Sequence, residues 1–232
     1  RDQQLVLQRP GIATVSLGHG RSRPAGPITQ GDQLGKAAQR NDIVKVKRLL
    51  KRGVDVNTQN AGPGVTPLGV ACERGHMEVV PALIEAHAFL DEPTNDGLTA
   101  LHIAAGMGNG AMAKALLDAG AAADQPDQMK MLPLHYAADH DSAEAANILL
   151  ADPKAKGAID AQAEDECPAL HHAASLGRPD VVRALLDAGA ATDKEDKKGN
   201  TALADAKEKG HHDVATVLAT ATPAEDAPPA EG

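Results

Sequence analysis

The stretch TALHIAAGMGNGAMAKALLDAG (residues 99–120) decides the fold because its residue pattern is repeated along the chain. Its first half reappears as LPLHYAADHD from Leu132 and as PALHHAASLG from Pro168. The leucine of this phrase recurs at steps of 33, 33, 36 and 33 residues, at Leu68, Leu101, Leu134, Leu170 and Leu203. A fixed period of this size is the signature of a repeat architecture. With Leu34 one step upstream, the sequence predicts six units between about residues 32 and 221.

Each unit has the pattern of two short helices. A Thr or its equivalent precedes Pro or Ala, as in TPLG from Thr66, which is the order of an N-cap and a first helical residue. Apolar residues follow at helical spacing, then a break that is often Gly, then a second apolar stripe such as VVRALL from Val181. One such pair cannot bury its apolar stripe alone, but stacked pairs can. Because aromatic residues make up only 1% of the 232 residues, the core must consist of Ala, Leu, Val and Ile.

The period and the phrases TALHIAA from Thr99, LPLHYAA from Leu132 and VVRALLDAG from Val181 resemble the ankyrin repeat. The resemblance covers residues 32–221 and implies an all-α ankyrin-repeat solenoid of six helix-pair units with short finger turns. It also implies a concave face made of the fingers and the ends of the first helices. On this face the family recognises other proteins, without catalysis.

The two ends of the chain differ in composition from the repeats. Residues 1–31 form a basic Gly/Pro/Arg-containing N-terminal arm, with Arg1, Arg9, Arg21 and Arg23 against Asp2. This composition is typical of an organelle transit peptide and equally of a basic docking arm. Residues 222–232 form a Pro/Ala/Glu-rich C-terminal tail, typical of disorder. In the fourth unit, ADPKAKGAIDAQAEDE from Ala151 is three residues longer than its counterparts, and we expect its finger to protrude or to kink the stack.

The net charge bears on the class of partner, and the cysteine content bears on the cellular compartment. The net charge of −9 argues against nucleic-acid binding, which needs clustered Lys and Arg. Cys72 and Cys167 match no metal-ligand spacing and favour a reducing compartment. No apolar run approaches the roughly 20 residues that span a bilayer, so we expect no direct membrane insertion. We therefore expect a soluble intracellular protein, in the cytoplasm or in the interior of a plastid or mitochondrion.

The histidines are interpreted as structural. His102, His135 and His171 occupy the same position in successive units, where the resemblance implies bonds from each imidazole to the neighbouring finger. Asp139, His140 and Asp141, together with Cys167, are residue types that could form a metal site or a hydrolytic active site. However, three consecutive residues at a helix end do not face one point. We expect no metal, no cofactor and no enzymatic activity.

The candidate binding site lies where the resemblance places the finger tips and the exposed ends of the first helices. Four of the five Met residues fall in two adjacent units, and flexible thioethers suit adaptable binding surfaces. The predicted partner-binding residues are Glu73, Arg74, Leu98, Met107, Met129, Met131, Tyr136 and His140. Two alternatives stay open: Met129 and Met131 pack into their own finger, where Lys130 replaces the usual Gly, and Tyr136 fills a gap between helices. The acidic fingers beyond, from Glu164 and from Asp193, are either a solvated rim or a surface that steers a basic partner.

The sequence predicts a non-enzymatic scaffold or adaptor that binds a protein partner on its concave groove and fingers. The alternative function is a permanent accessory or assembly subunit of a large complex, perhaps organellar, anchored by its N-terminal arm.

Overall fold

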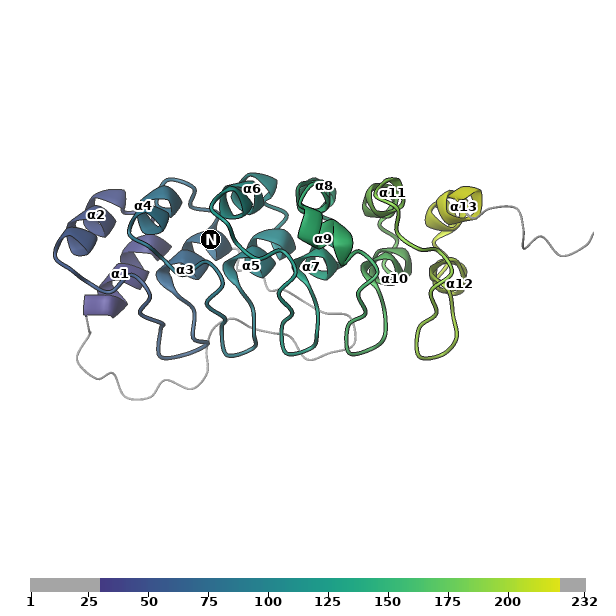
Figure 1. Cartoon of the computed structure of the whole chain (residues 1–232), viewed down its shortest axis with the longest axis horizontal. Helices are drawn as coiled ribbons and strands as arrows, with labels where there is room; N and C mark the ends of the chain where they lie inside the picture. The colour runs from purple at the N-terminus through teal and green to yellow at the C-terminus, as the bar shows by residue number, and fades with distance from the viewer. Residues whose placement is uncertain (1–29, 222–232) are drawn as a thin grey trace, which may run out of the picture.

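The computed structural model describes residues 30–221, and this part of the chain forms helices in two layers (Figure 1). The inner layer contains α1 (Gln30–Gln39), α3 (Pro67–Arg74), α5 (Ala100–Gly106), α7 (Pro133–Asp139), α10 (Ala169–Ser175) and α12 (Ala202–Glu208). The outer layer contains α2 (Ile43–Lys51), α4 (Val80–Glu85), α6 (Gly110–Asp118), α8 (Ala143–Leu150), α11 (Pro179–Asp187) and α13 (His212–Ala221). Between residues 30 and 221 the only β-type pairing is the isolated bridge from Glu195 to Thr201. The prediction of an all-α solenoid of six helix pairs is confirmed.

The fingers are the loops at residues 54–65, 88–98, 121–131, 158–167 and 190–200, which join each outer helix to the next inner helix. In Figure 1 they project side by side from the inner layer. The predicted C-terminal tail lies outside the described residues, as does the predicted N-terminal arm up to residue 29. Residues 30 and 31, which the sequence assigned to the arm, already belong to α1.

The repeated leucine builds the core between the layers. Leu34, Leu68, Leu101, Leu134 and Leu170 are at most 2% exposed, and Leu203 in the last unit is half-buried. Burial of one such side chain contributes about 1.5–3 kcal/mol. The paired alanines that follow, such as Ala104 and Ala105, are fully buried and let successive inner helices pack closely. Each layer therefore depends on its neighbours for its hydrophobic core.

The helix ends follow the capping residues in the sequence. The Thr66 side chain accepts a hydrogen bond from Gly69 N at 3.2 Å, and Pro67 begins α3. Gly120 and Gly189 follow α6 and α11 with φ of 98° and 97°, a left-handed conformation that glycine adopts without strain. His87 holds the same conformation after α4, with φ 61°, in place of the usual glycine.

The extra residues of the fourth unit form a helix of their own, α9 (Pro153–Gly157). Asp152 caps this helix by accepting from Lys154 N and Ala155 N, and Pro153 occupies its first position. Ala155 is 1% exposed, so α9 packs against the stack beside α8. Of the two outcomes expected for this insertion, a protruding finger or a kinked stack, the first is wrong, because α9 absorbs the insertion and the finger in Figure 1 reaches as far as its neighbours.

Candidate protein-interaction surface

Hydrogen bonds between successive fingers hold them in a row. Asn95 N donates to Pro63 O at 2.9 Å, Gln128 N to Asp96 O at 3.3 Å and Glu164 N to Met129 O at 2.8 Å. Side chains add to this ladder: Asn95 Nδ2 donates to Gly62 O at 2.8 Å and Lys197 Nζ to Glu164 O. Because every finger is bonded to the next, the finger row presents a pre-organised surface, which lowers the entropic cost of binding.

His102 and His135 link each unit to the finger of the next. Nδ1 of His102 accepts from Thr99 N at 3.1 Å, so Nε2 carries the proton and donates to Met131 O at 3.1 Å. His135 repeats this arrangement with Leu132 N and with Ala161 O, both at 3.1 Å. Burial lowers the pKa of both rings, that of His135 to about 4. Both rings are therefore neutral donors at physiological pH.

His171 occupies the same position but has different partners. Its helix begins after Pro168, which has no N–H for Nδ1 to accept from. Nδ1 instead faces Asp205 Oδ2 of α12 at 3.0 Å, while Nε2 faces Lys194 O at 2.9 Å. Both ring nitrogens of His171 therefore face oxygen atoms, whereas His102 and His135 each face one backbone N–H and one backbone carbonyl.

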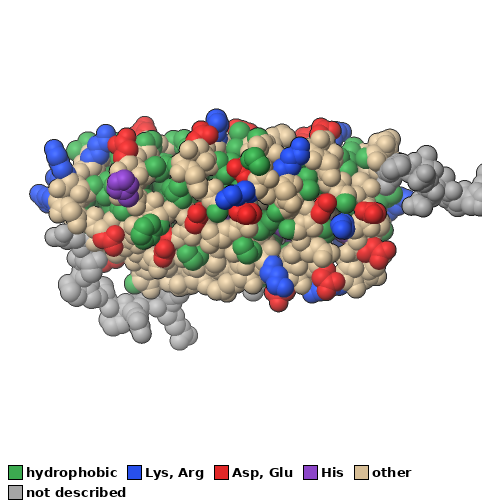
Figure 2. Space-filling view, in the orientation of Figure 1, with side chains coloured by type: hydrophobic (Ala, Val, Ile, Leu, Met, Phe, Trp, Pro, Cys, Tyr) green, Lys and Arg blue, Asp and Glu red, His purple; other side chains and the backbone are tan. Residues whose placement is uncertain are grey.

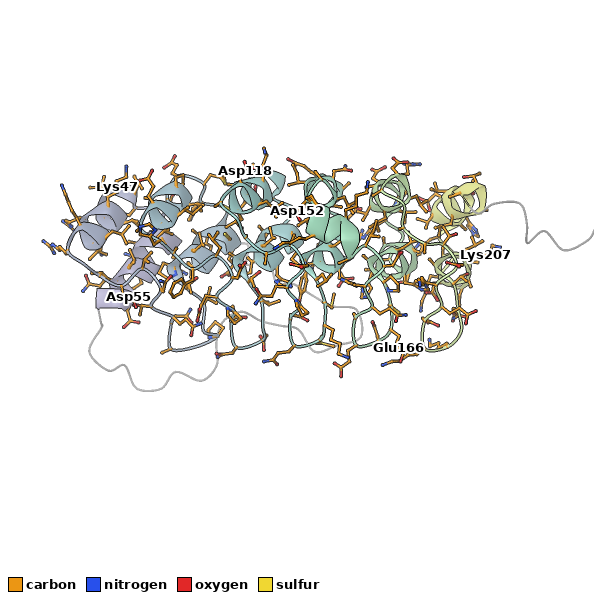
Figure 3. The ribbon with its side chains drawn as sticks, viewed as in Figure 1. Lys47, Asp55, Asp118, Asp152, Glu166 and Lys207 are labelled. Atoms are coloured by element: carbon orange, nitrogen blue, oxygen red, sulfur yellow. The ribbon has the colours of Figure 1, made fainter. Side chains whose placement is uncertain are left out.

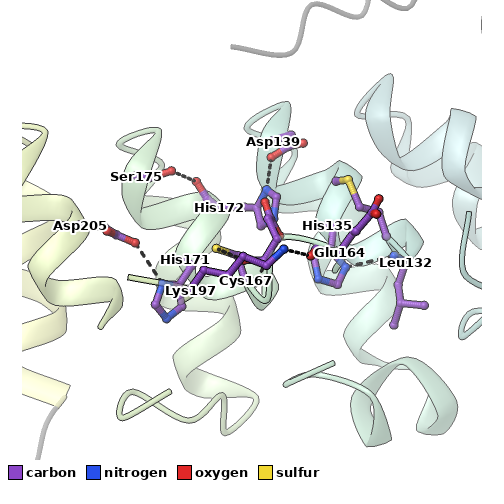
Figure 4. A network of polar contacts seen from close by, with 12 residues as sticks. Leu132, His135, Asp139, Glu164, Cys167, His171, His172, Ser175, Lys197 and Asp205 are labelled. Atoms are coloured by element: carbon purple, nitrogen blue, oxygen red, sulfur yellow. Dashed lines mark hydrogen bonds and ion pairs between the residues drawn. The ribbon is translucent and has the colours of Figure 1, made fainter. Parts of the chain in front are cut away.

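His172 lies in a charged contact between α10 and α7 (Figure 4). Its Nδ1 donates to Asp139 Oδ1 at 2.8 Å, and Nε2 lies 3.7 Å from Asp165 Oδ2, an ion-pair distance without a hydrogen bond. Burial alone would lower the pKa of His172, but the two carboxylates outweigh it and raise the pKa to about 9. The interaction with His172 lowers the pKa of Asp165 to about 2. The charged imidazolium also lowers the pKa of His135, whose ring centroid lies 5.4 Å away.

The ends of the inner helices form a row of solvent-accessible side chains, here called the helix-end row. Its members are Arg74, Met107, His140 and Leu176, which follow one another at the repeat spacing of 33, 33 and 36 residues. Arg74 is exposed and the other three are half-buried. Glu73, also half-buried, precedes Arg74, and burial raises its pKa. The row runs across four units at the C-terminal ends of the inner helices, whereas the fingers lead into the N-terminal ends of these helices.

Three of the predicted partner-binding residues are buried, so their assignment to an exposed patch is wrong. Leu98, Met131 and Tyr136 are 3%, 4% and 5% exposed. Leu98 and Met131 close their fingers through backbone hydrogen bonds and point into the core. The Tyr136 hydroxyl donates to Asp127 Oδ2 at 2.7 Å, and its ring meets His102 edge-on at 5.4 Å. The hydroxyl thus reaches a finger carboxylate while the ring fills the gap between helices, which is the alternative the sequence left open.

Met107 and Met129 are half-buried: each side chain is partly accessible to solvent and also packs against the core. The structure therefore places Arg74, Met107 and His140 in the helix-end row, with Glu73 beside Arg74, and it places Met129 on a finger.

Acidic side chains, with Lys and Arg among them, gather over the fingers below α10 and α12 in Figure 2.

The residues that could have formed a hydrolytic cluster have separate partners. Asp139 binds His172, and Asp141 lies 3.5 Å from Arg178. Cys167 Sγ donates to Asp165 O at 3.6 Å, and burial with the nearby carboxylates raises the pKa of the thiol to about 12. A thiol that stays protonated is a weak nucleophile and a poor metal ligand. Cys72 is a buried free thiol, and residues 30–221 hold no group of three or more metal-ligating side chains.

Sequence reasoning did not single out His172, because it considered the histidines that occupy the repeated position, His102, His135 and His171. Its partner Asp139 lies 33 residues earlier on the neighbouring inner helix, whereas the step between these two units is 36 residues, so the period did not align the pair. Within the described range no helix is both long and apolar enough to cross a bilayer.

Comparison with known proteins identifies the repeats. The family described as "Ankyrin repeats (3 copies)" matches residues 34–127, 89–160 and 134–226. Ankyrin repeat domain-containing protein 40 of Mus musculus and of Homo sapiens are each 44% identical over 59 residues. These matches span 25% of this chain and 16% of each relative. The E3 ubiquitin-protein ligase hecd-1 of Caenorhabditis elegans is 50% identical over 52 residues, 21% of this chain and 2% of that protein.

A solved structure matches over a greater length. It is a chain from the complex of the Bd0816 predatory endopeptidase from Bdellovibrio bacteriovorus with the immunity protein Bd3460. That chain is 31% identical, with a TM-score of 0.71, and the match covers 81% of this chain and 96% of that chain.

Proposed function

The chain belongs to the ankyrin-repeat family, and from this premise we propose that it binds a protein partner on the fingers and the helix-end row. Ankyrin repeats have a protein–protein interaction role and are generally non-enzymatic scaffolds. The observation that carries the proposal is a row of accessible side chains at repeat spacing, from Arg74 to Leu176, on the same scaffold as a row of mutually bonded fingers. Side chains on a rigid scaffold bind without losing much conformational freedom.

The face suits a partner with mixed chemistry. Met107 and Leu176 offer apolar contact area within the row, while Glu73 and Arg74 supply charges at its N-terminal end. Flexible thioethers fit irregular apolar surfaces, and the polar rim fixes orientation. Leu98, Met131 and Tyr136 position this face from beneath and do not touch the partner.

The test is a double variant, Met107→Glu with His140→Glu, compared with Ala111→Glu and Asn147→Glu on exposed positions of α6 and α8. Both double variants add two acidic groups to the same two units. Proteins that co-purify with the tagged chain from its source cells are quantified by mass spectrometry, and circular dichroism verifies folding. We expect the first variant to lose the partner and the second to retain it. Equal retention by both would place the partner elsewhere.

The solved complex favours a narrower candidate, in which the partner is a peptidase. The matched chain is part of a complex between an endopeptidase and an immunity protein, and the match covers almost all of it. We expect the purified chain to bind the Bd0816 endopeptidase in isothermal titration calorimetry, and the Met107→Glu, His140→Glu variant to bind it more weakly. Absence of binding heat together with separate elution in gel filtration would contradict this candidate.

The alternative of a permanent accessory subunit depends on the basic arm, whose residues up to 29 lie outside the described structure. Deletion of residues 1–29 separates the two proposals. An arm-anchored subunit leaves its complex on deletion, whereas a partner bound on the helix-end row is retained.

A further inference from the structure

The exposed large apolar side chains of residues 30–221 lie in the first two units and outside the helix-end row. They are Val44 on α2 (75% exposed), Met77 before α4 (36%) and Phe89 after α4 (60%). Phe89 is the single Phe of the chain. An exposed aromatic ring beside other apolar groups commonly marks a contact site.

Phe89 borders a groove of about 530 Å³ between the first two units. Leu50, Val54, Val56 and Phe89 supply its apolar lining, and Asp55 and Asn57 contribute polar atoms. Asn57 Oδ1 accepts from Phe89 N at 2.7 Å, and Asn57 N donates to Asp55 Oδ1 at 2.9 Å. One bond between units therefore fixes the backbone of Phe89 beside the groove, and the groove has room for a large apolar side chain.

The helix beside the groove is basic, in contrast to the rest of the chain. Residues 30–52 contain seven Lys and Arg against two Asp, whereas residues 53–221 contain 12 Lys and Arg against 26 Asp and Glu. The seven cations are Lys36, Arg40, Lys45, Lys47, Arg48, Lys51 and Arg52. Within the described structure none of them forms an ion pair with a carboxylate. Figure 2 shows Lys and Arg gathered at the end of the molecule where α2 lies.

Three of these cations are close in sequence to residues that line the groove. Leu50 lines the groove, and Lys47 lies three residues earlier, on the same face of α2. Lys51 and Arg52 follow Leu50 directly, and both are exposed. Figure 3 shows Lys47 on α2 and Asp55 at the same end of the solenoid. The groove thus has an apolar lining and one carboxylate, that of Asp55, and the exposed cations Lys51 and Arg52 lie in the chain between its lining residues Leu50 and Gly53.

We infer that this face is a second docking surface, for an acidic protein segment that carries a large apolar side chain. The apolar side chain lies in the groove against Phe89 and Leu50. The carboxylates that flank it bind Lys47, Lys51 and Arg52. This surface is separate from the helix-end row, so one chain can hold two partners.

Charge distribution favours a short acidic protein segment over a nucleic acid or a membrane. The cationic face extends along one helix of nine residues, about 13 Å, whereas beyond it the surface has an excess of carboxylates. An extended polyanion would meet that excess, but a short segment would not. The apolar groove can bind an apolar side chain of a protein segment, but it offers no favourable contact to a phosphate group.

The test uses fluorescein-labelled peptides and the full chain. The first is a short glutamate-rich peptide with a central Phe, the second has Ser in place of Phe, and the third has Lys in place of Glu. Fluorescence anisotropy is measured in low salt and in about 0.5 M NaCl, where surface charges are screened. We expect the first peptide to bind best, the second more weakly, and the third not at all, with strong weakening by salt.

Variants of the chain locate the contact. Lys51→Glu with Arg52→Glu should weaken the first peptide about tenfold, because two attractions become repulsions. Phe89→Ser should reduce the first peptide to the affinity of the second. The matched control is Lys154→Glu with Lys156→Glu, the same charge change on exposed positions of α9, and it should retain affinity.

Three results would overturn the inference. One is unchanged affinity in the Lys51, Arg52 variant, and another is equal binding of the Phe and Ser peptides. The third is binding of phosphatidylserine vesicles or single-stranded DNA as tight as that of the first peptide, which would make this face a general polyanion site. The Met107→Glu, His140→Glu variant should bind the peptide normally, so a failure here is distinct from a failure of the proposed function.

Discussion

His87, Lys130 and Glu166 hold left-handed backbone conformations at positions where other units have glycine. Their φ angles are 61°, 58° and 64°. In the fingers, Lys130 and Glu166 match Gly97, whose φ is 87°. A side chain in this region places its Cβ against the backbone and costs about 1–2 kcal/mol. These residues are therefore local weak points in an otherwise regular stack.

We expect Glu166→Gly and His87→Gly each to raise the free energy of unfolding by about 1 kcal/mol, because the Cβ strain is removed. The measurement is urea denaturation followed by circular dichroism. Gly97→Ala provides the opposite control, since a Cβ there would lie 2.7 Å from Gln128 N. A loss of stability in Glu166→Gly would show that its side chain stabilises the finger.

The charge of His172 makes the junction between the fourth and fifth units dependent on pH. The pKa of its ring is raised from 6.5 to about 9, so folding favours the protonated form. The stabilisation is fully present below pH 6.5 and is lost as pH rises to about 9. At 1.36 kcal/mol per pKa unit, its full size is about 3 kcal/mol.

We expect the unfolding free energy of the wild-type chain to fall between pH 6.5 and pH 9 by more than that of His172→Gln. Urea titrations at several pH values measure the difference. His212→Gln, at an exposed position of α13, is the control and should follow the wild type. Parallel curves for wild type and His172→Gln would mean that the two carboxylates do not hold a charged ring.

At the scale of elements, the residue that precedes each inner helix decides which group the histidine at that junction binds. Thr99 and Leu132 offer a backbone N–H to the following histidine, and Pro168 does not. The third histidine, His171, therefore turns to Asp205 on the next inner helix. A single proline thus changes the hydrogen-bond partner of the histidine at this junction from a backbone N–H to a carboxylate.

The short helix α9 shows how an insertion is accommodated without disturbing the repeat. Asp152 and Pro153 begin a new helical turn, and Ala155 buries its methyl group against the stack. Asp91 and Asp160 accept from the backbone of the following loop, at Ala122 N and Ala191 N, both at 2.9 Å. Asp124 has the same repeat position but makes no such bond in the described structure, because α9 precedes the loop it would reach.

We expect Ala155→Glu to lower the unfolding free energy by about 2–4 kcal/mol, since it forces a carboxylate into a closed apolar contact. Limited proteolysis should then cut between α8 and α10. Lys154→Glu, at the exposed neighbouring position, should leave both stability and cleavage unchanged. Equal protease resistance of the two variants would mean that α9 does not need this contact.

At the scale of the molecule, the solenoid is a one-dimensional stack in which each unit contacts only its neighbours. The end units have a neighbour on one side, so they lose less burial when they open. Charge is also distributed along this axis, with a basic first unit and acidic units beyond it. Two separate faces, the helix-end row and the α2 groove, can therefore act on one rigid body.

We expect backbone amides to exchange with deuterium fastest in α1, α2 and α13 and slowest in α5 to α8. Hydrogen exchange followed by mass spectrometry measures this gradient. Uniform exchange along the chain would indicate one cooperative unit, and slow exchange at the first unit would indicate that a further contact covers it.

The sequence alone determined the architecture, because the evidence is repeated. The spacing of Leu68, Leu101 and Leu134 and the capping by Thr66 are local signals that recur in each unit. Stacking identical units fixes how neighbours pack, so the period predicts the solenoid and its buried leucines.

Only the tertiary structure decided which irregular side chains face solvent. Periodicity places Leu98, Met131 and Tyr136 on a finger or a helix, but their direction depends on partners in other segments, as the bond from Tyr136 to Asp127 shows. The charged pair of His172 with Asp139 likewise forms between two units. Burial and charge are properties of assembled neighbours, and a single unit of sequence does not contain them.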